Sequence, residues 1–337
     1  MAGNKNRNMK IPTYFILGYP RSGTTWFANL FNTHPDVAYR HEMIGRCYRS
    51  FPEALFTKLK NSYSLSDDDY QEAIKIVMTP NVESDRAPFF HKNHLTLDYP
   101  RLHYTLWLAS KTVPLLRPAY GRMFYPKGNR LKLIIKETRS ALNMDSITQA
   151  LRSDKNIILF RHPCGAIASS LNGISSGRMQ ASTEADRLKW FEDNKDRKYL
   201  KDLELEKPQF LSIPEHEYLA LRWRLQNEDY LNFFTPDKNI YIHYEDFMID
   251  QEQKVKNLFS KLPLSYDPVV KQFILTSSGV KSSQPLLKDS SSKYYSVYRS
   301  ADFNPNKWKD SLSSEQIDII ERHTLDTFNK LTESYIH

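Results

Sequence analysis

The sequence has 337 residues, 40% of them hydrophobic, with 47 Lys and Arg against 39 Asp and Glu and a formal charge of +8. This composition excludes a disordered chain, and the two cysteines, Cys47 and Cys164, are too few for a disulfide framework. The positive charge indicates an anionic ligand. Basic and acidic residues are interspersed, so we expect no nucleic-acid partner. No apolar run could span a bilayer, so we expect a cytoplasmic protein.

The first predicted elements form a strand, a loop and a helix. Residues 1–10 are typical of a flexible polar tail. Tyr14–Leu17 is a short apolar run of the kind found in buried parallel strands. Thr24–Thr33 carries apolar residues at helical spacing and ends before Pro35. We therefore expect a glycine-containing loop between a buried strand and a helix.

Further apolar runs predict the rest of the sheet. Helical segments separate most of these runs, and strands that alternate with helices form a parallel sheet covered on both faces. The sequence therefore predicts an α/β fold, a P-loop-like central parallel sheet flanked by helices with helical insertions. The additional strands are expected at Val37–Tyr39, Leu131–Ile135, Asn156–Phe160 and Ile240–His243.

We expect residues 11–337 to form a single domain. Residues 45–128 are aromatic and poor in strand patterns, which favours a helical insert, and residues 176–207 are highly charged and lid-like. Long segments of this kind in α/β enzymes often contact the substrate, so we expect both on the acceptor side of the site. A serine-rich loop is predicted at 282–295 and an amphipathic, Ser-capped helix at 313–331.

The loop Gly18–Thr25 has the outline of a phosphate-binding loop, with two glycines separated by four residues and two hydroxyl residues opening a helix. Free backbone N–H groups at a helix start attract anions. Thr24 stands where a nucleoside triphosphatase has its lysine, and the positive charge comes earlier, at Arg21. The loop therefore predicts an anion site that differs from that of a magnesium-dependent phosphotransferase, which remains an alternative.

Polar residues follow several predicted strands at their carboxyl ends. Glu42 follows the second strand closely, Lys136 follows Leu131–Ile135, and Arg161 follows Asn156–Phe160. Ser169 comes eight residues after Arg161, inside a predicted helix. Because parallel strands end at one edge of the sheet, where ligands bind, we expect these side chains to meet at one crevice.

Two motifs together resemble a known family. GYPRSGTTW followed by RHPCGAIASSLNG resembles the paired nucleotide motifs of the sulfotransferases that use 3'-phosphoadenosine 5'-phosphosulfate (PAPS), and HYEDF resembles a third, weaker family segment. The tail WKDSLSSEQIDIIERHTLDTF resembles bacterial and Golgi-type carbohydrate sulfotransferases. The likeness covers residues 13–45 and 131–175 and is weaker from 218 onward. It implies transfer of a sulfuryl group to a hydroxyl of a carbohydrate, glycolipid or other small acceptor, a phenol being second choice, and release of 3'-phosphoadenosine 5'-phosphate (PAP).

The resemblance also implies the donor-binding residues. Trp26 would stack on or near the adenine, although the buried face of the helix is an alternative place for it. Arg161 and Ser169 would hold the 3'-phosphate, with Ser170 as a rival and Arg299 as a looser candidate. The 5'-phosphosulfate would lie on Arg21, Ser22, Gly23, Thr24 and Thr25.

Sulfuryl transfer needs positive groups at the leaving phosphate and a base for the acceptor proton, and Arg21 and Lys136 suit the first role. The cytosolic members carry a histidine where this chain has Thr138, whereas bacterial members acting on sugars use a glutamate placed like Glu42. Glu42 is therefore the expected base, with Glu137 second, His41 third, and an ion pair with Arg46 as the alternative role of Glu42. We expect no metal, because no histidine or carboxylate group shows the spacing of a metal site. A non-catalytic nucleotide-binding protein is the remaining alternative.

Overall fold

The computed structural model describes residues 10–138, 143–233, 235, 237–277 and 304–335. The chain forms two compact units, one comprising Met1–Phe160 with Phe233–Phe303 and the other Arg161–Asn232 with Asn304–His337. The single-domain organisation stays a prediction. Residues 1–9 of the predicted tail and the predicted loop at 282–295 lie outside the described residues.

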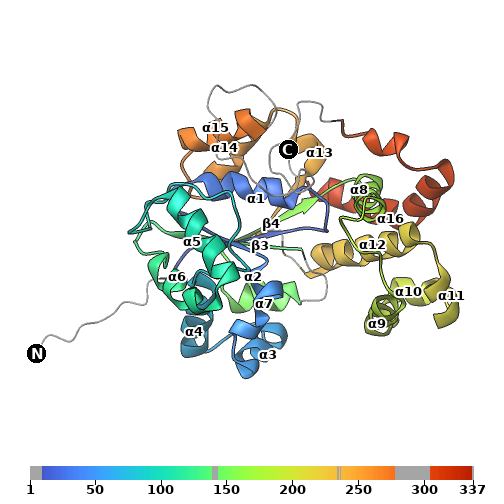
Figure 1. The fold of residues 1–337 in the computed structure, drawn as a ribbon. Coiled ribbons are helices and arrows are strands. Elements are labelled where there is room, and N and C mark those ends of the chain that lie inside the picture. Colours follow the sequence, from blue (N-terminus) through green and yellow to red (C-terminus); the bar gives the residue numbers. More distant parts are fainter. Residues whose placement is uncertain (1–9, 139–142, 234, 236, 278–303, 336–337) are drawn as a thin grey trace, which may run out of the picture. The chain divides into compact units, whose positions relative to one another are not determined.

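The first unit contains a five-stranded sheet in the order β2-β3-β1-β4-β5, in which every neighbouring pair is parallel (Figure 1). This confirms the predicted α/β class. At their carboxyl ends β2 and β3 run further than predicted, because the ladder between them continues as far as His41 opposite Lys136. Lys136 and His41 are therefore strand residues. The strands are β1 (Thr13–Leu17), β2 (Val37–His41), β3 (Lys132–Glu137), β4 (Lys155–Phe160) and β5 (Asn239–His243).

Helices cover both faces of this sheet (Figure 1). On one face, α1 (Thr24–Thr33) directs the apolar side chains of its 3.6-residue repeat into a core shared with the helices after β5. Phe27 and Phe31 are fully buried there. The helices after β5 are α13 (Tyr244–Phe247), α14 (Gln251–Lys261) and α15 (Pro268–Ser277), and α7 (Met144–Ala150) lies on the opposite face.

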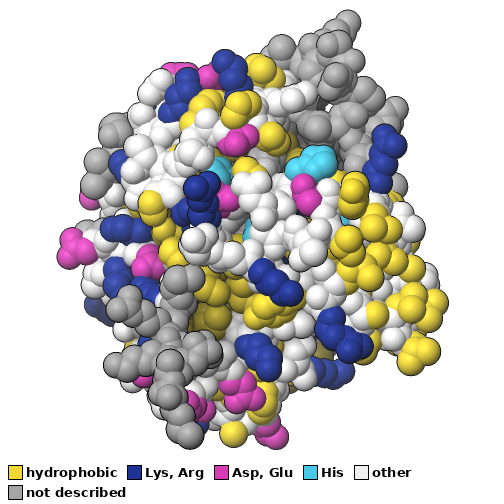
Figure 2. Space-filling model, turned by 90° about the vertical axis from the view of Figure 1, so that its left-hand side faces the viewer, with side chains coloured by type: hydrophobic (Ala, Val, Ile, Leu, Met, Phe, Trp, Pro, Cys, Tyr) yellow, Lys and Arg dark blue, Asp and Glu magenta, His cyan; other side chains and the backbone are white. Residues whose placement is uncertain are grey.

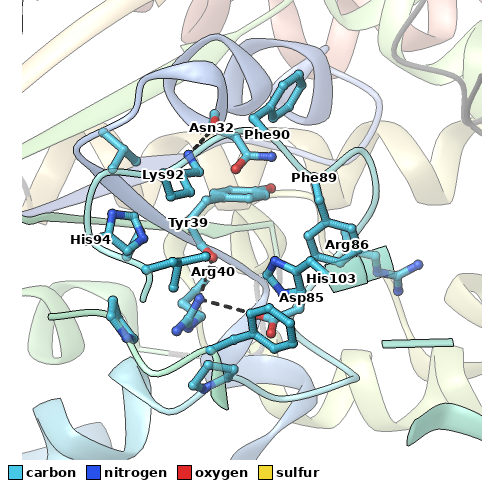
Figure 3. Close-up of a pocket in the computed structure, with 16 residues that line it drawn as sticks. Asn32, Tyr39, Arg40, Asp85, Arg86, Phe89, Phe90, Lys92, His94 and His103 are labelled. Carbon is cyan, nitrogen blue, oxygen red and sulfur yellow. Dashed lines mark hydrogen bonds and ion pairs between the residues drawn. The ribbon is translucent and has the colours of Figure 1, made fainter. Parts of the chain in front are cut away.

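The segment between β2 and β3 belongs to the first unit, and its described elements are helices, as predicted, with an irregular stretch at 79–99. Buried Arg40 on β2 anchors it, since its guanidinium donates to the carbonyls of Val77 and Met78 and pairs with Asp85 at 3.3 Å (Figure 3). Tyr120 donates a further hydrogen bond to Asp85 at 2.7 Å. The segment comprises α2 (Met43–Arg46), a 3-10 turn at Tyr48–Ser50, α3 (Glu53–Asn61), α4 (Asp67–Met78), α5 (Pro100–Thr112), a 3-10 turn at Pro114–Leu116, and α6 (Arg117–Met123).

The second unit is helical throughout its described residues. One of its cores includes Cys164, Trp308 and Ile320, and another includes Phe191 and Phe210. The last helix begins with the predicted capping arrangement, in which Ser313 accepts from the backbone of Gln316. The helices are α8 (Pro163–Ser175), α9 (Glu184–Asn194), α10 (Lys198–Asp202), α11 (Lys207–Ser212), α12 (Glu215–Phe233), the 3-10 turn Lys307–Asp310, and α16 (Ser314–Ser334).

Candidate active site

The loop between β1 and α1 depends on its two glycines. A Cβ at Gly18 would lie 2.4 Å from the carbonyl oxygen of Leu159, and a Cβ at Gly23 would lie 2.3 Å from the ring of Tyr244. Gly23 also has φ +84°, a left-handed conformation that favours glycine. It caps α1 without a side-chain hydrogen bond. The first N–H groups of α1 therefore form a start of the kind that binds anions.

Two polar residues of the same loop strengthen this conclusion. Ser22 is fully buried, and its Oγ has no hydrogen-bond partner within the described chain. Leaving a buried hydroxyl unsatisfied costs about 1–3 kcal/mol. Arg21, at φ +69°, brings a guanidinium to the same turn. The loop therefore has the donors and the positive charge to fit a phosphosulfate group.

A cavity of about 450 Å³ lies against this loop, and every residue that lines it belongs to the first unit. It brings together the loop, the ends of β2 and β3, and α5 of the helical segment. The lining residues are Pro20, Arg21, Thr24, Thr25, Asn29, Tyr39, His41, Glu42, Arg46, Arg86, Ala87, Trp107, Lys136 and Thr138. The first unit therefore places the predicted catalytic residues at one cavity, as the parallel strands require.

Glu42 lies at the centre of a hydrogen-bonded group on this cavity. Its Oε1 accepts from Lys136 Nζ at 2.6 Å and from Thr138 Oγ1 at 2.9 Å, and its Oε2 accepts from Arg46 Nε at 2.7 Å. Its backbone has φ +52°, and the residue is 7% exposed. The carboxylate is thus fixed in one orientation beside the phosphate-binding loop.

The charges around Glu42 determine its ionisation. Burial raises its pKa, but the charge of Lys136, the hydrogen bond from Lys136 and the charge of Arg46 outweigh burial, so the pKa lies well below its usual range. Burial likewise lowers the pKa of Lys136, and the charge of Glu42 opposes this change. Glu42 is therefore a carboxylate at neutral pH, paired with a buried ammonium group.

The two alternative bases lie in different surroundings. Glu137 does not line the cavity, and its Oε1 accepts from the backbone N–H groups of Ile44 at 2.7 Å and Gly45 at 3.2 Å. Burial raises the pKa of Glu137 to about 7. His41 lines the cavity, its Nδ1 lies 2.8 Å from the hydroxyl of Tyr39, and burial lowers its pKa well below the usual value. This placement favours Glu42 over Glu137 and leaves His41 as the rival.

The structure places Trp26 in the core, and its assignment to the adenine stays a prediction. Trp26 is 2% exposed, donates its indole N–H to Ser277 Oγ at 2.9 Å, and stacks on Phe273 with ring centroids 6.4 Å apart. It does not line the cavity. It lies on the buried face of α1, where its large apolar surface packs into the core.

The predicted 3'-phosphate residues lie in the second unit. Arg161 precedes α8, and a Cβ at Gly165 would lie 2.9 Å from its Nε, so the glycine lets the guanidinium lie along the first turn of the helix. Ser169 is one turn further on and partly exposed, whereas Ser170 is buried and donates to the carbonyl of Ala166 at 3.1 Å. This geometry favours Ser169 over Ser170. Arg299 lies outside the described residues.

Sequence reasoning missed several residues that line or support the cavity. Arg86 and Trp107 come from the helical segment and line the cavity, although no motif marks either of them. Tyr244 supports the loop by packing on Gly23, and only the HYEDF segment hinted at its importance. Within the described residues no group of three or more His, Cys, Asp or Glu could hold a metal ion, and none of the described helices is long and apolar enough to cross a membrane.

Comparison with known proteins gives one family match. A model described as "Sulfotransferase family" matches residues 12–268. Solved structures similar to the chain include the sulfotransferase domain of the Synechococcus PCC 7002 olefin synthase, at 17% identity, covering 94% of this chain and 96% of that one, with a TM-score of 0.43. Mouse sulfotransferase SULT7A1 complexed with PAP is similar at 14% identity, covering 96% and 88%, with a TM-score of 0.47. No curated protein matches.

Proposed function

The chain belongs to the sulfotransferase family, and we propose that it transfers a sulfuryl group from PAPS to a hydroxyl of a carbohydrate, glycolipid or other small acceptor. The observation that carries this proposal is the shared cavity of the first unit. There a helix start without a side-chain cap and Arg21 lie beside the ion pair of Glu42 and Lys136. A charged loop for the donor and a fixed carboxylate for the acceptor are the two parts that such a transfer needs.

The donor supplies the activated sulfuryl group. In our proposal the backbone of Ser22–Thr25 and the side chain of Arg21 hold its 5'-phosphosulfate, and Arg161 with Ser169 holds its 3'-phosphate. Two separate phosphate sites would distinguish PAPS from nucleotides that lack the 3'-phosphate. The absence of a lysine at Thr24 argues against the alternative, a magnesium-dependent phosphotransferase.

The chemistry follows from the positions of the charged groups. Glu42 accepts the proton of the acceptor hydroxyl while the oxygen of that hydroxyl bonds to sulfur and the bond from sulfur to the bridging oxygen breaks. Negative charge then develops on the leaving phosphate, where Lys136 and Arg21 stabilise it. Thr138 and Arg46 hold the Glu42 carboxylate in place through this step.

Thermal unfolding tests the donor assignment. We expect PAP to raise the melting temperature without added metal, because a ligand at 100 times its Kd stabilises the folded state by about 2.7 kcal/mol. ATP with magnesium should give no comparable increase, since the loop lacks the lysine that holds a triphosphate. Equal stabilisation by ATP, or a requirement for magnesium, would contradict the sulfotransferase assignment and favour a phosphotransferase.

Replacing Arg161 by alanine tests the second phosphate site. A charge-assisted contact contributes about 1.5–3 kcal/mol, so Arg161→Ala should weaken PAP binding roughly ten- to a hundredfold. Binding of adenosine 5'-phosphosulfate, which lacks the 3'-phosphate, should barely change. Calorimetric titration of both nucleotides gives the comparison, and an equal loss for the two would show that Arg161 does not select the 3'-phosphate.

A further inference from the structure

A second and larger hollow of the first unit, of about 740 Å³, lies between the helix after β2 and the helices α4 and α6. We call it the basic hollow. Figure 2 shows the side of the molecule that carries α5 and α6, with Lys and Arg side chains spread over it. The hollow is lined by six basic residues and one acidic residue: Arg46, Arg49, Lys75, Arg117, Arg122 and Lys127, with Glu83.

The basic side chains of this hollow have few partners. In the described part of the chain, no acidic residue pairs with any of its basic residues except Arg46. Three of its arginines use only Nε in a hydrogen bond: Arg49 to the Tyr48 hydroxyl at 3.1 Å, Arg117 and Arg122 to backbone carbonyls at 3.2 and 3.3 Å. Their terminal nitrogens, which suit phosphate and sulfate oxygens, have no described partner.

Elsewhere in the same unit, basic side chains are commonly neutralised. Lys58 pairs with Asp69 at 2.7 Å and Lys254 with Asp246 at 2.6 Å. A cluster of unpaired like charges around one concave surface repels itself and is stabilised when an anion binds. The excess charge of the hollow is therefore a local feature that the net charge of the chain does not by itself explain.

Arg46 connects this hollow to the catalytic cavity, because it lines both. Its Nε donates a hydrogen bond to Glu42 Oε2 at 2.7 Å. A residue of the basic hollow is therefore in direct contact with the expected base. The two hollows thus share Arg46 as a wall residue, and an acceptor whose hydroxyl lies at Glu42 would reach the basic hollow along this side chain.

From this arrangement we infer that the acceptor carries a phosphate or sulfate group in addition to the hydroxyl that reacts, and that the basic hollow binds this group. The inference rests on the proposed function and narrows its acceptor to an anionic molecule. Arg49 and Lys75 then act as acceptor-binding residues, separate from the donor loop, which is the phosphate-binding loop Gly18–Thr25.

Binding of sucrose octasulfate and of sucrose to the protein saturated with PAP tests the inference. PAP occupies the donor loop, so any further anion binding reports another site. We expect the wild type to bind sucrose octasulfate at least tenfold more tightly than sucrose, and less tightly as salt is added. The double variant Arg49→Ala with Lys75→Ala should lose about tenfold or more in affinity for the sulfated sugar.

Two controls make the outcome specific. Arg130→Ala removes an exposed arginine that lines neither hollow and should leave the affinity for sucrose octasulfate unchanged. PAP affinity should be the same in all variants, and failure of PAP to bind at all would contradict the proposed function instead. Equal binding of the two sugars, or an unchanged affinity in the double variant, would overturn the inference. So would binding of phosphatidylcholine vesicles containing phosphatidylserine with no binding of the sulfated sugar, because the hollow would then face a lipid surface.

Discussion

Substituting glutamine for Glu42 should lower turnover by about a hundredfold or more, because general-base catalysis contributes roughly a hundred- to ten-thousandfold. Glutamine keeps the shape of the side chain, and its one oxygen can still accept the hydrogen bond from Thr138. Its amide NH2 group can neither accept from Arg46 nor take the acceptor proton. PAP affinity should change little, because Glu42 belongs to the acceptor side of the cavity. Steady-state turnover and calorimetric PAP binding measure the two effects separately.

The two rival bases supply the controls for this prediction. Glu137→Gln should retain turnover, because Glu137 does not line the cavity and is held by the backbone of Ile44 and Gly45. His41→Asn should also retain most of the turnover, because the Nδ1 of His41 is engaged with the Tyr39 hydroxyl at 2.8 Å. If Glu42→Gln keeps near-normal turnover while His41→Asn loses it, the base is His41 and the donor assignment is unaffected.

Replacing Lys136 by methionine should lower turnover by roughly a hundred- to a thousandfold, the usual effect of removing one group that stabilises charge in the transition state. Methionine retains the apolar volume of the buried side chain and removes the ammonium that lies 2.6 Å from Glu42. Loss of that charge also raises the pKa of Glu42. Initial rates over a range of pH, with folding checked by thermal unfolding, measure the effect.

Lys132→Met is the matched control, because Lys132 begins the same strand and donates to the carbonyl of Arg130, away from the cavity. Its turnover should stay within about twofold of the wild type, as for surface substitutions generally. The double variant Glu42→Gln with Lys136→Met should lose less than the product of the single effects, because the two residues act as a unit. A Lys136→Met protein with near-normal turnover would remove Lys136 from the mechanism.

The sheet and the donor loop could be predicted from the sequence, because their signals are local. Runs such as Tyr14–Leu17 and Asn156–Phe160 are apolar throughout, which is what strands buried on both faces require. The glycines of the loop mark the two positions where a Cβ would collide with Leu159 or Tyr244. Convergence of Arg21, Glu42 and Lys136 then followed from the common edge of a parallel sheet.

The remaining features depend on tertiary contacts that no local pattern records. The resemblance could place Trp26 near the loop but could not show which face of α1 is buried, and its bond to Ser277 joins residues 251 positions apart. Arg86 and Trp107 of the helical segment line the cavity because α5 packs against it and because Arg40 of β2 anchors the segment through Asp85. The basic hollow likewise is lined by side chains of helices that are far apart in the sequence. Because acidic and basic residues are interspersed along the chain, no sequence pattern predicts this concentration of positive charge.

Transfer of sulfur label from PAPS to an acceptor tests directly whether the protein is a sulfotransferase that uses PAPS. The protein is incubated with sulfur-labelled PAPS and separate pools of neutral and anionic sugars and glycolipids, and labelled product and PAP are quantified. From the proposed function we expect labelled acceptor and PAP in equal amounts, with no added metal, from the anionic pool, and a loss of about a hundredfold or more in Glu42→Gln. PAP binding without transfer to any pool, or transfer of phosphate from ATP with magnesium, would contradict it.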